Sequence, residues 1–325
     1  MPSSEAGCPT AWEASGYSSL HQWSAGGAII GTSFAETFPM FSLLGIVGSG
    51  TLGGLSFYHI TQTTAVRITP DAPTKAIARL TIWGALSSPI FLPVSAWLVQ
   101  TYHWRTAIRV LAVPATVFLV LSAFAVRARP AHSPQRVLRF LLRAARDSAE
   151  IRRFLMASAM GGMVLSILLV YQVPVMTSLG LPLATAAWIA ALRGFSQLLG
   201  RIPLTPIVER LGARGATQMA LMAVGIGILL LTGSGQVIFG VAFALLAGFG
   251  IEAMSPLQGI YTNELYDAEG LGSAMGFVTV LFASFGALGP AIVGALADAT
   301  GSRLCAVVIG ATAAGLGAIL LIPRR

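Results

Sequence analysis

Long apolar stretches that carry almost no charge limit the folds open to this chain more than any other feature. Apolar residues make up 55% of its 325 residues and charged residues only 10%, whereas soluble domains carry roughly 25% charged residues. In lipid every backbone polar group needs an internal partner, and a helix supplies one within each segment. The sequence therefore predicts an all-α fold, a polytopic membrane helical bundle.

About ten segments are predicted to be transmembrane helices, since a helix needs about 20 mostly apolar residues to cross a bilayer. Their approximate ranges are 18–36, 39–65, 78–100, 106–126, 154–178, 184–206, 216–233, 237–260, 273–297 and 304–322. The first is the weakest, because it is short and runs into Glu36 and Pro39. Four spans precede an arginine-rich segment and six follow it. An even number returns both termini to one side of the membrane.

The arginine-rich segment, from Arg127 to Arg153, sets the predicted topology. It contains eight arginines and only two acidic residues, Asp147 and Glu150, so it holds +6 of the formal net charge of +8. Basic loops stay in the cytoplasm, and sixteen of the basic residues fall on this implied side against three on the other. We therefore expect an integral protein of a bacterial inner membrane with both termini cytoplasmic. Nucleic-acid binding is not expected, because the basic residues recur between spans instead of forming one surface.

The chain is expected to have four parts. Residues 1–17 form a polar N-terminal tail, 18–126 an incomplete N-terminal helical half, 127–153 a basic cytoplasmic linker and 154–325 a six-helix C-terminal half. In both halves a proline is followed, about a dozen residues later, by an arginine. Pro93 and Arg105 lie 197 and 198 positions before Pro290 and Arg303. If the halves are equivalent, two spans are missing from the first.

Three motifs resemble those of the major facilitator superfamily. His103, Trp104 and Arg105 stand where that family has GWR after its fifth helix. Residues 200–214 (GRIPLTPIVERLGAR) are similar to the second copy of its GxxxDRxGRR loop, and residues 289–302 to its GPxxxGxxxDxxGS motif. The resemblance implies two helical halves that move a small-molecule solute by alternating access without a cofactor. The first copy of the loop is absent, so we expect the chain to begin at the family's third helix.

Charged or titratable side chains within the spans are the first candidates for function, because Arg or Asp at membrane depth costs roughly 2.5–3.5 kcal/mol on insertion scales. They are His59, Arg193 and Glu252. The resemblance places them on the family's fourth, eighth and tenth helices, which border its central cavity.

Arg193 is predicted to receive a carboxylate in a bidentate pair. The helix around it resembles that of monocarboxylate transporters, although Ile189 stands where they have an acid. The alternative for Arg193 is a structural pair with Glu252. Glu252 itself precedes Pro256, which is expected to kink the helix, and acts either as a proton carrier or as a structural counter-ion.

Four further residues complete the predicted site. His59 suits proton coupling, with hydrogen bonding at the water boundary as the alternative. Tyr171 and Gln172 are expected either to contact the solute or to pack between helices. Gln197, one turn after Arg193, shares its face and has the same two options.

The linker also contains an amphipathic pattern between Arg136 and Phe154, with Leu141 and Leu142 on its apolar side. Such a pattern favours a helix on the inner membrane surface, in contact with anionic lipid.

Two functions remain open. The first is a secondary active transporter, a symporter or antiporter, that acts as a monomer on a small anionic organic solute. Its transport is either coupled to protons or independent of them. The second is a truncated, non-transporting membrane remnant or scaffold. The sequence shows no nucleophile with a base, no metal-ligand cluster and no HExxH motif, so neither enzyme activity nor a metal site is predicted.

Overall fold

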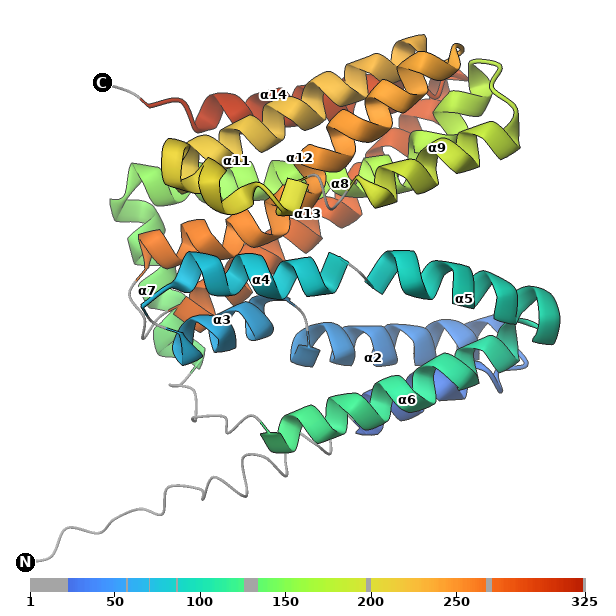
Figure 1. Cartoon of the computed structure of the whole chain (residues 1–325), viewed down its shortest axis with the longest axis horizontal. Coiled ribbons are helices and arrows are strands. Elements are labelled where there is room, and N and C mark those ends of the chain that lie inside the picture. The colour runs from blue at the N-terminus through green and yellow to red at the C-terminus, as the bar shows by residue number, and fades with distance from the viewer. Residues whose placement is uncertain are drawn as a thin grey trace, which may run out of the picture. The chain divides into compact units, whose positions relative to one another are not determined.

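The computed structural model describes residues 23–56, 58–69, 71–85, 87–125, 134–196, 200–266 and 271–323, without the side chains of 52–60, 67–68, 85–89, 92–93, 96, 100 and 122–140. Within these ranges the regular structure is helical and contains no strand (Figure 1). The predicted all-α fold is confirmed.

The chain divides into two compact units. The first comprises Met1–Ile60 and Ile90–Arg136, and the second comprises Thr61–Pro89 and Val137–Arg325. This grouping follows packing, so residues 61–89 join the C-terminal helices that they touch. The predicted four-part division of the chain stays a prediction.

The first unit contains a helical segment over 23–32, α2 (Phe38–Ser56), most of α5 (Ser87–Tyr102) and α6 (Trp104–Ala125). The HWR motif joins α5 to α6. Arg105 Nη2 donates a hydrogen bond to the Ala35 carbonyl at 2.9 Å, and Arg109 Nε donates to Ser33 Oγ at 2.9 Å. These bonds tie the start of α6 to the loop that follows the first helical segment.

The second unit contains the end of α3 (Tyr58–Ile68), then α4 (Pro73–Ala85), α7 (Pro134–Asp147), α8 (Ala149–Ser178) and α9 (Leu183–Phe195). It continues with α11 (Leu204–Leu230), α12 (Val237–Leu265), α13 (Leu271–Thr300) and α14 (Cys305–Leu320). Helix α11 begins twelve residues before the span predicted at 216, because the GRIPLTPIVERLGAR segment is itself largely helical. Gly212 bends α11 there with a φ of +70°, a conformation that glycine adopts without strain.

Five helical segments of the described chain are long and apolar enough to cross a membrane. They are Trp104–Leu121, Ala149–Ser178, Leu204–Gly233, Val237–Leu265 and Leu271–Thr300. Shorter apolar helices lie at Phe38–Thr51, Leu183–Phe195 and Cys305–Leu320. The span predicted at 78–100 covers most of α4 and α5, and residue 86 between them lies outside the described residues. The predicted membrane helical bundle is confirmed.

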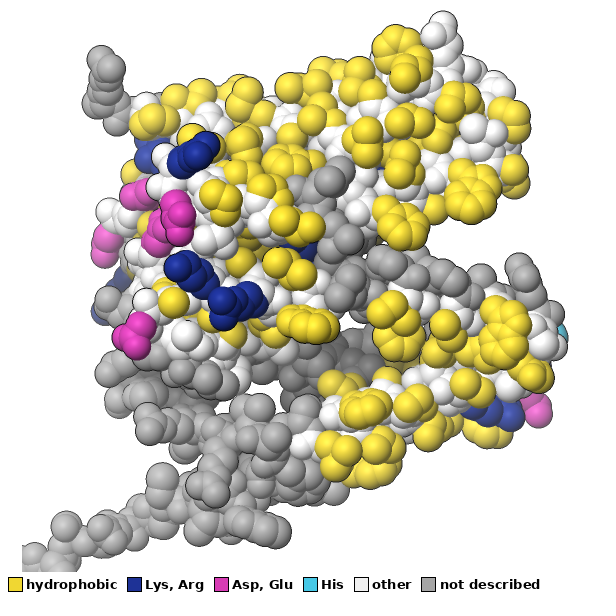
Figure 2. Space-filling view, in the orientation of Figure 1, with side chains coloured by type: hydrophobic (Ala, Val, Ile, Leu, Met, Phe, Trp, Pro, Cys, Tyr) yellow, Lys and Arg dark blue, Asp and Glu magenta, His cyan; other side chains and the backbone are white. Residues whose placement is uncertain are grey.

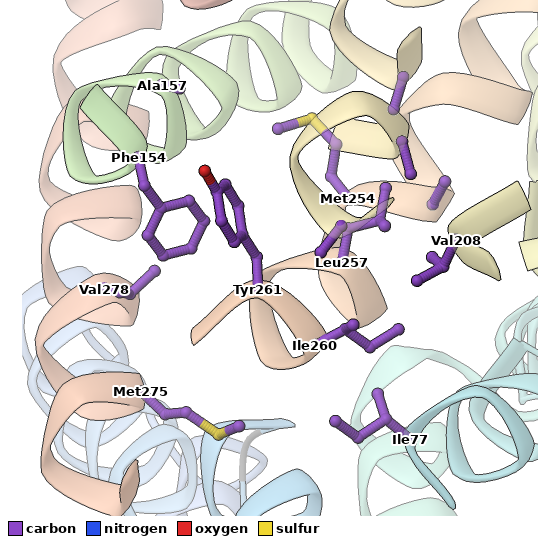
Figure 3. Packing of buried hydrophobic residues seen from close by; sticks show 14 of the residues in the cluster. Ile77, Phe154, Ala157, Val208, Met254, Leu257, Ile260, Tyr261, Met275 and Val278 are labelled. Carbon is purple, nitrogen blue, oxygen red and sulfur yellow. The ribbon is translucent and has the colours of Figure 1, made fainter. Parts of the chain in front are cut away.

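The core of the second unit is a layer of apolar side chains from α4, α8, α11, α12 and α13 (Figure 3). At its centre the rings of Phe154 and Tyr261 lie 4.5 Å apart. Leu141 of α7 joins this core with 2% of its surface exposed, whereas Leu142 is 52% exposed. The expectation that both leucines face lipid is therefore wrong for Leu141, which packs against the protein.

The outer surface of these helices is apolar. In Figure 2 hydrophobic side chains cover much of the visible face of the second unit, and the charged side chains of that unit gather toward the end where the C-terminus lies. Trp188 is 76% exposed and Trp83 is 75% exposed. Soluble proteins rarely present contiguous apolar surface on this scale, but lipid accepts it.

Candidate functional site

Three charged side chains converge inside the second unit. Glu252 of α12 lies between two arginines: its Oε2 is 3.0 Å from Arg201 Nη2, and its Oε1 is 3.8 Å from Arg193 Nη1. The side chains of Arg193, Arg201 and Glu252 are 7%, 4% and 15% exposed. One carboxylate therefore pairs with two guanidinium groups, and the formal charges of these three described side chains sum to one surplus positive charge.

Arg193 was expected from the sequence, and the structure gives it two partners. Its Nε donates a hydrogen bond to Gln172 Oε1 of α8 at 3.0 Å. The 3.8 Å contact with Glu252 is an ion pair too long for a hydrogen bond. Arg193 Nη1 is one of the buried nitrogens in the described chain that have no hydrogen-bond partner. A buried donor left without a partner is costly, so this atom is the natural place for a further acceptor.

Arg201 was missed as a site residue. The sequence counted it among the basic residues between spans, and that expectation is wrong because Arg201 is 4% exposed. Its Nε donates to the Glu252 carbonyl at 3.3 Å, and its Nη1 donates to the carbonyl of Thr81 in α4. One signal could have found it: Arg201 follows Arg193 by eight residues, a spacing that belongs to one face of a helix.

Two glycines bring the helices close enough to form this cluster. A Cβ atom on Gly248 would lie 2.8 Å from the Arg193 carbonyl oxygen and 2.5 Å from Ser196 Cβ. A Cβ atom on Gly250 would lie 3.0 Å from the backbone nitrogen of Val224 in α11. Helix α12 therefore meets α9 on one side and α11 on the other, and it presents Glu252 just after both contacts.

Pro256 lies inside α12, one turn after Glu252, yet the helix continues through it to Leu265. Pro256 has no N–H to donate to the carbonyl four residues earlier, that of Glu252, and this carbonyl accepts from Arg201 Nε at 3.3 Å. Gln62 Nε2 of α3 donates to the neighbouring Ser255 carbonyl at 3.2 Å.

The remaining predicted residues do not join the cluster. Tyr171 points to α13, where its hydroxyl donates to the Pro290 carbonyl at 3.2 Å. The side chain of His59 and the whole of Gln197 lie outside the described residues. In the part of the chain that the structure describes, no three His, Cys, Asp or Glu side chains are grouped so that they could hold a metal ion.

The profile of the Major Facilitator Superfamily matches residues 154–325, more than half of the chain. The chain belongs to this superfamily. Family membership makes it an integral membrane transporter rather than an enzyme, as the motifs predicted, and supports secondary transport. The likeness to monocarboxylate transporters stays a prediction.

Solved structures of superfamily transporters share the fold. The transporter FucP in its outward conformation gives a TM-score of 0.72 at 13% identity over 96% of this chain and 82% of that one. A variant of the E. coli fucose:proton symporter FucP gives 0.70 at 13% identity over 95% and 83%. The proton:xylose symporter XylE, bound to 6-bromo-6-deoxy-D-glucose, gives 0.69 at 11% identity over 95% and 79%. No curated protein sequence matches the chain. At such identities the likeness shows the fold and leaves the solute open.

Proposed function

We propose that this protein is a secondary transporter of a small organic anion, that it works by alternating access, and that Arg193 binds the anionic group. The observation that carries the proposal is the surplus positive charge of the cluster formed by Arg193, Arg201 and Glu252. Burying an unpaired charge costs several kcal/mol in real proteins, because the ion loses its hydration. An anionic solute would offset that cost while it is bound.

The two arginines are not equivalent, and the difference supports Arg193 as the residue that binds the solute. Arg201 donates hydrogen bonds to the Glu252 carboxylate and to the backbone carbonyls of Thr81 and Glu252. Arg193 makes one hydrogen bond, to Gln172, and keeps Nη1 without a hydrogen-bond acceptor among the described residues. A guanidinium presents its donors in a planar fork that matches a carboxylate. Gln172 then orients the guanidinium, and Glu252 acts as the counter-ion of the pair.

A neutral sugar is the competing class of solute, because FucP and XylE are proton symporters of sugars. It would bind by hydrogen bonds alone and would leave the surplus charge of the cluster in place. The two solute classes therefore differ in their dependence on Arg193. We also propose that both termini are cytoplasmic and that the monomer is the transporting unit.

The test uses the full chain in proteoliposomes, where the uptake of radiolabelled solute reports transport whether or not net charge moves. The panel contains lactate, succinate, glucuronate and neutral xylose, each applied with and without an inward proton gradient. We expect uptake of at least one carboxylate and none of xylose. Arg193→Lys should lower the carboxylate uptake about tenfold or more, because a hydrogen bond to a charged group contributes roughly 1.5–3 kcal/mol.

The matched control is Arg210→Lys, which makes the same change at an exposed position of α11. It should leave the uptake unchanged. Uptake of xylose with no uptake of a carboxylate would refute the anionic solute, and equal uptake by both lysine variants would refute the role of Arg193.

A further inference from the structure

A cavity of about 270 Å³ lies where the end of α14 meets the start of α8, and it is lined by Arg153, Ile319, Leu320 and Ile322. Both helices belong to the second unit and pack against each other. The cavity is separate from the charge cluster, and its interpretation is independent of the proposed solute.

The walls of the cavity combine one cation with apolar side chains. Ile319 is 61% exposed and Ile322 is 46% exposed. Ile319 lies in the last turn of the short apolar helix α14 (Cys305–Leu320), and Ile322 lies two residues after its end. Arg153 lies in the second turn of α8, a membrane-spanning helix, at the same end of the bundle. The cavity therefore lies at the depth where lipid headgroups meet acyl chains.

The charges around the cavity leave Arg153 available to an anion. The nearest acid in sequence, Glu150, is engaged elsewhere: it accepts a hydrogen bond from Tyr261 at 2.9 Å and lies 3.9 Å from Arg214. Arg214 in turn donates to the carbonyls of Leu321 and Ile322 at 2.8 and 2.7 Å. In the described part of the chain, no carboxylate lies within ion-pair distance of Arg153.

A second arginine reinforces the positive potential. Arg152 Nη1 donates to the carbonyls of Ala145 and Arg146 at 3.3 and 2.5 Å, so its charge is fixed beside the junction of α7 and α8. Arg143 and Arg146 are exposed on the last turns of α7. Clustered basic residues at the cytoplasmic end of membrane helices attract anionic lipid.

We propose that this cavity is a binding site for one anionic phospholipid of the cytoplasmic leaflet. The phosphate pairs with the Arg153 guanidinium, and the first methylenes of an acyl chain cover Leu320 and Ile322. The rest of this acyl chain lies along the exposed side chain of Ile319. Neither a free phosphate nor a zwitterionic lipid offers both the net negative charge and the apolar tail.

The test is native mass spectrometry of the full-length protein in detergent, titrated with phosphatidylglycerol and separately with phosphatidylcholine of the same acyl chains. We expect one tight phosphatidylglycerol adduct and weaker, graded binding of phosphatidylcholine. Arg153→Gln should weaken the first phosphatidylglycerol adduct about fivefold, the effect expected for one basic residue near an anionic lipid surface. Arg210→Gln removes the same charge from an exposed position of α11 outside the cavity and should leave that adduct unchanged.

Two further measurements distinguish an anionic lipid from a free phosphate compound. Excess inorganic phosphate and excess glycerol 3-phosphate should not displace the phosphatidylglycerol adduct, because both lack the acyl chain. Arg153→Lys, which keeps the charge, should recover most of the binding. Equal loss in the Arg153→Gln and Arg210→Gln variants would overturn the site, as would full displacement by phosphate or equal affinity for the two lipids.

Discussion

Replacing Glu252 by glutamine tests the physical basis of the charge cluster. The amide keeps the shape of the carboxylate and removes its charge. Arg193 and Arg201 then each lose their ion pair with this carboxylate and remain buried cations. Arg201 retains its hydrogen bonds to the Thr81 and Glu252 carbonyls.

The distances give the scale of the loss. With an effective dielectric constant of about 20, the Coulomb attraction is about 5.5 kcal/mol at the 3.0 Å of Arg201 and about 4.4 kcal/mol at the 3.8 Å of Arg193. Desolvation opposes both attractions, and removing one partner of a buried ion pair typically costs about 3–5 kcal/mol. We expect Glu252→Gln to lower the free energy of unfolding by about that amount.

The assay is equilibrium unfolding of the purified protein in mixed micelles, followed by circular dichroism. Glu150→Gln is the matched reference, because the side chain of Glu150 is 48% exposed and lies 3.9 Å from Arg214, and the glutamine oxygen can still accept the hydrogen bond of the Tyr261 hydroxyl. Exposed pairs contribute about 0–1 kcal/mol, so this variant should be close to the wild type.

Double mutants sharpen the prediction. The coupling energy of Glu252 with Arg201 should exceed its coupling with Arg193, because the first pair is shorter and hydrogen-bonded. If Glu252→Gln is as stable as Glu150→Gln, or if the order of the couplings is reversed, the carboxylate is not the shared counter-ion described above.

Two other predictions concern the backbone. His103 has a φ of +75°, which costs an L-residue about 1–2 kcal/mol, so His103→Gly should raise the melting temperature, and His103→Ala, which keeps the strain, should not. Gly248→Ala would place a Cβ atom 2.8 Å from the Arg193 carbonyl oxygen and should cost about 1–3 kcal/mol of stability through overpacking. Its control is Gly194→Ala in α9, where no atom lies within 4 Å of the added Cβ; equal stability of the two alanine variants would contradict the close approach of α9 and α12.

The sequence was sufficient for the membrane bundle, because hydropathy reports directly on the solvent around each helix. It also singled out Arg193 and Glu252, since a charge within an apolar span stands out, and the structure places the two side chains 3.8 Å apart; their role in transport stays a prediction. Their mutual distance was not predictable, and it depends on Gly248 and Gly250, whose effect appears only when α9 and α11 are placed beside α12.

Arg201 shows why the rest could not be predicted. Near the end of a span an arginine can reach water or turn inward, and the local sequence is compatible with both. The outcome is decided by the Thr81 carbonyl, 120 residues earlier in the chain. The hydrogen bond between Gln62 and Ser255 similarly joins residues 193 positions apart, so no local pattern could report it.

The bare backbone at Gly248 has a mechanical consequence. Packed helices slide past one another when their side chains can change rotamer and shift in small steps. At Gly248 the main chain of α12 lies directly against the Arg193 carbonyl and the Ser196 side chain, so a shift of α9 along α12 would have to separate two closely packed backbones. In the alternating access proposed above, α9 and α12 are therefore expected to move together, and Arg193 and Glu252 to keep their spacing.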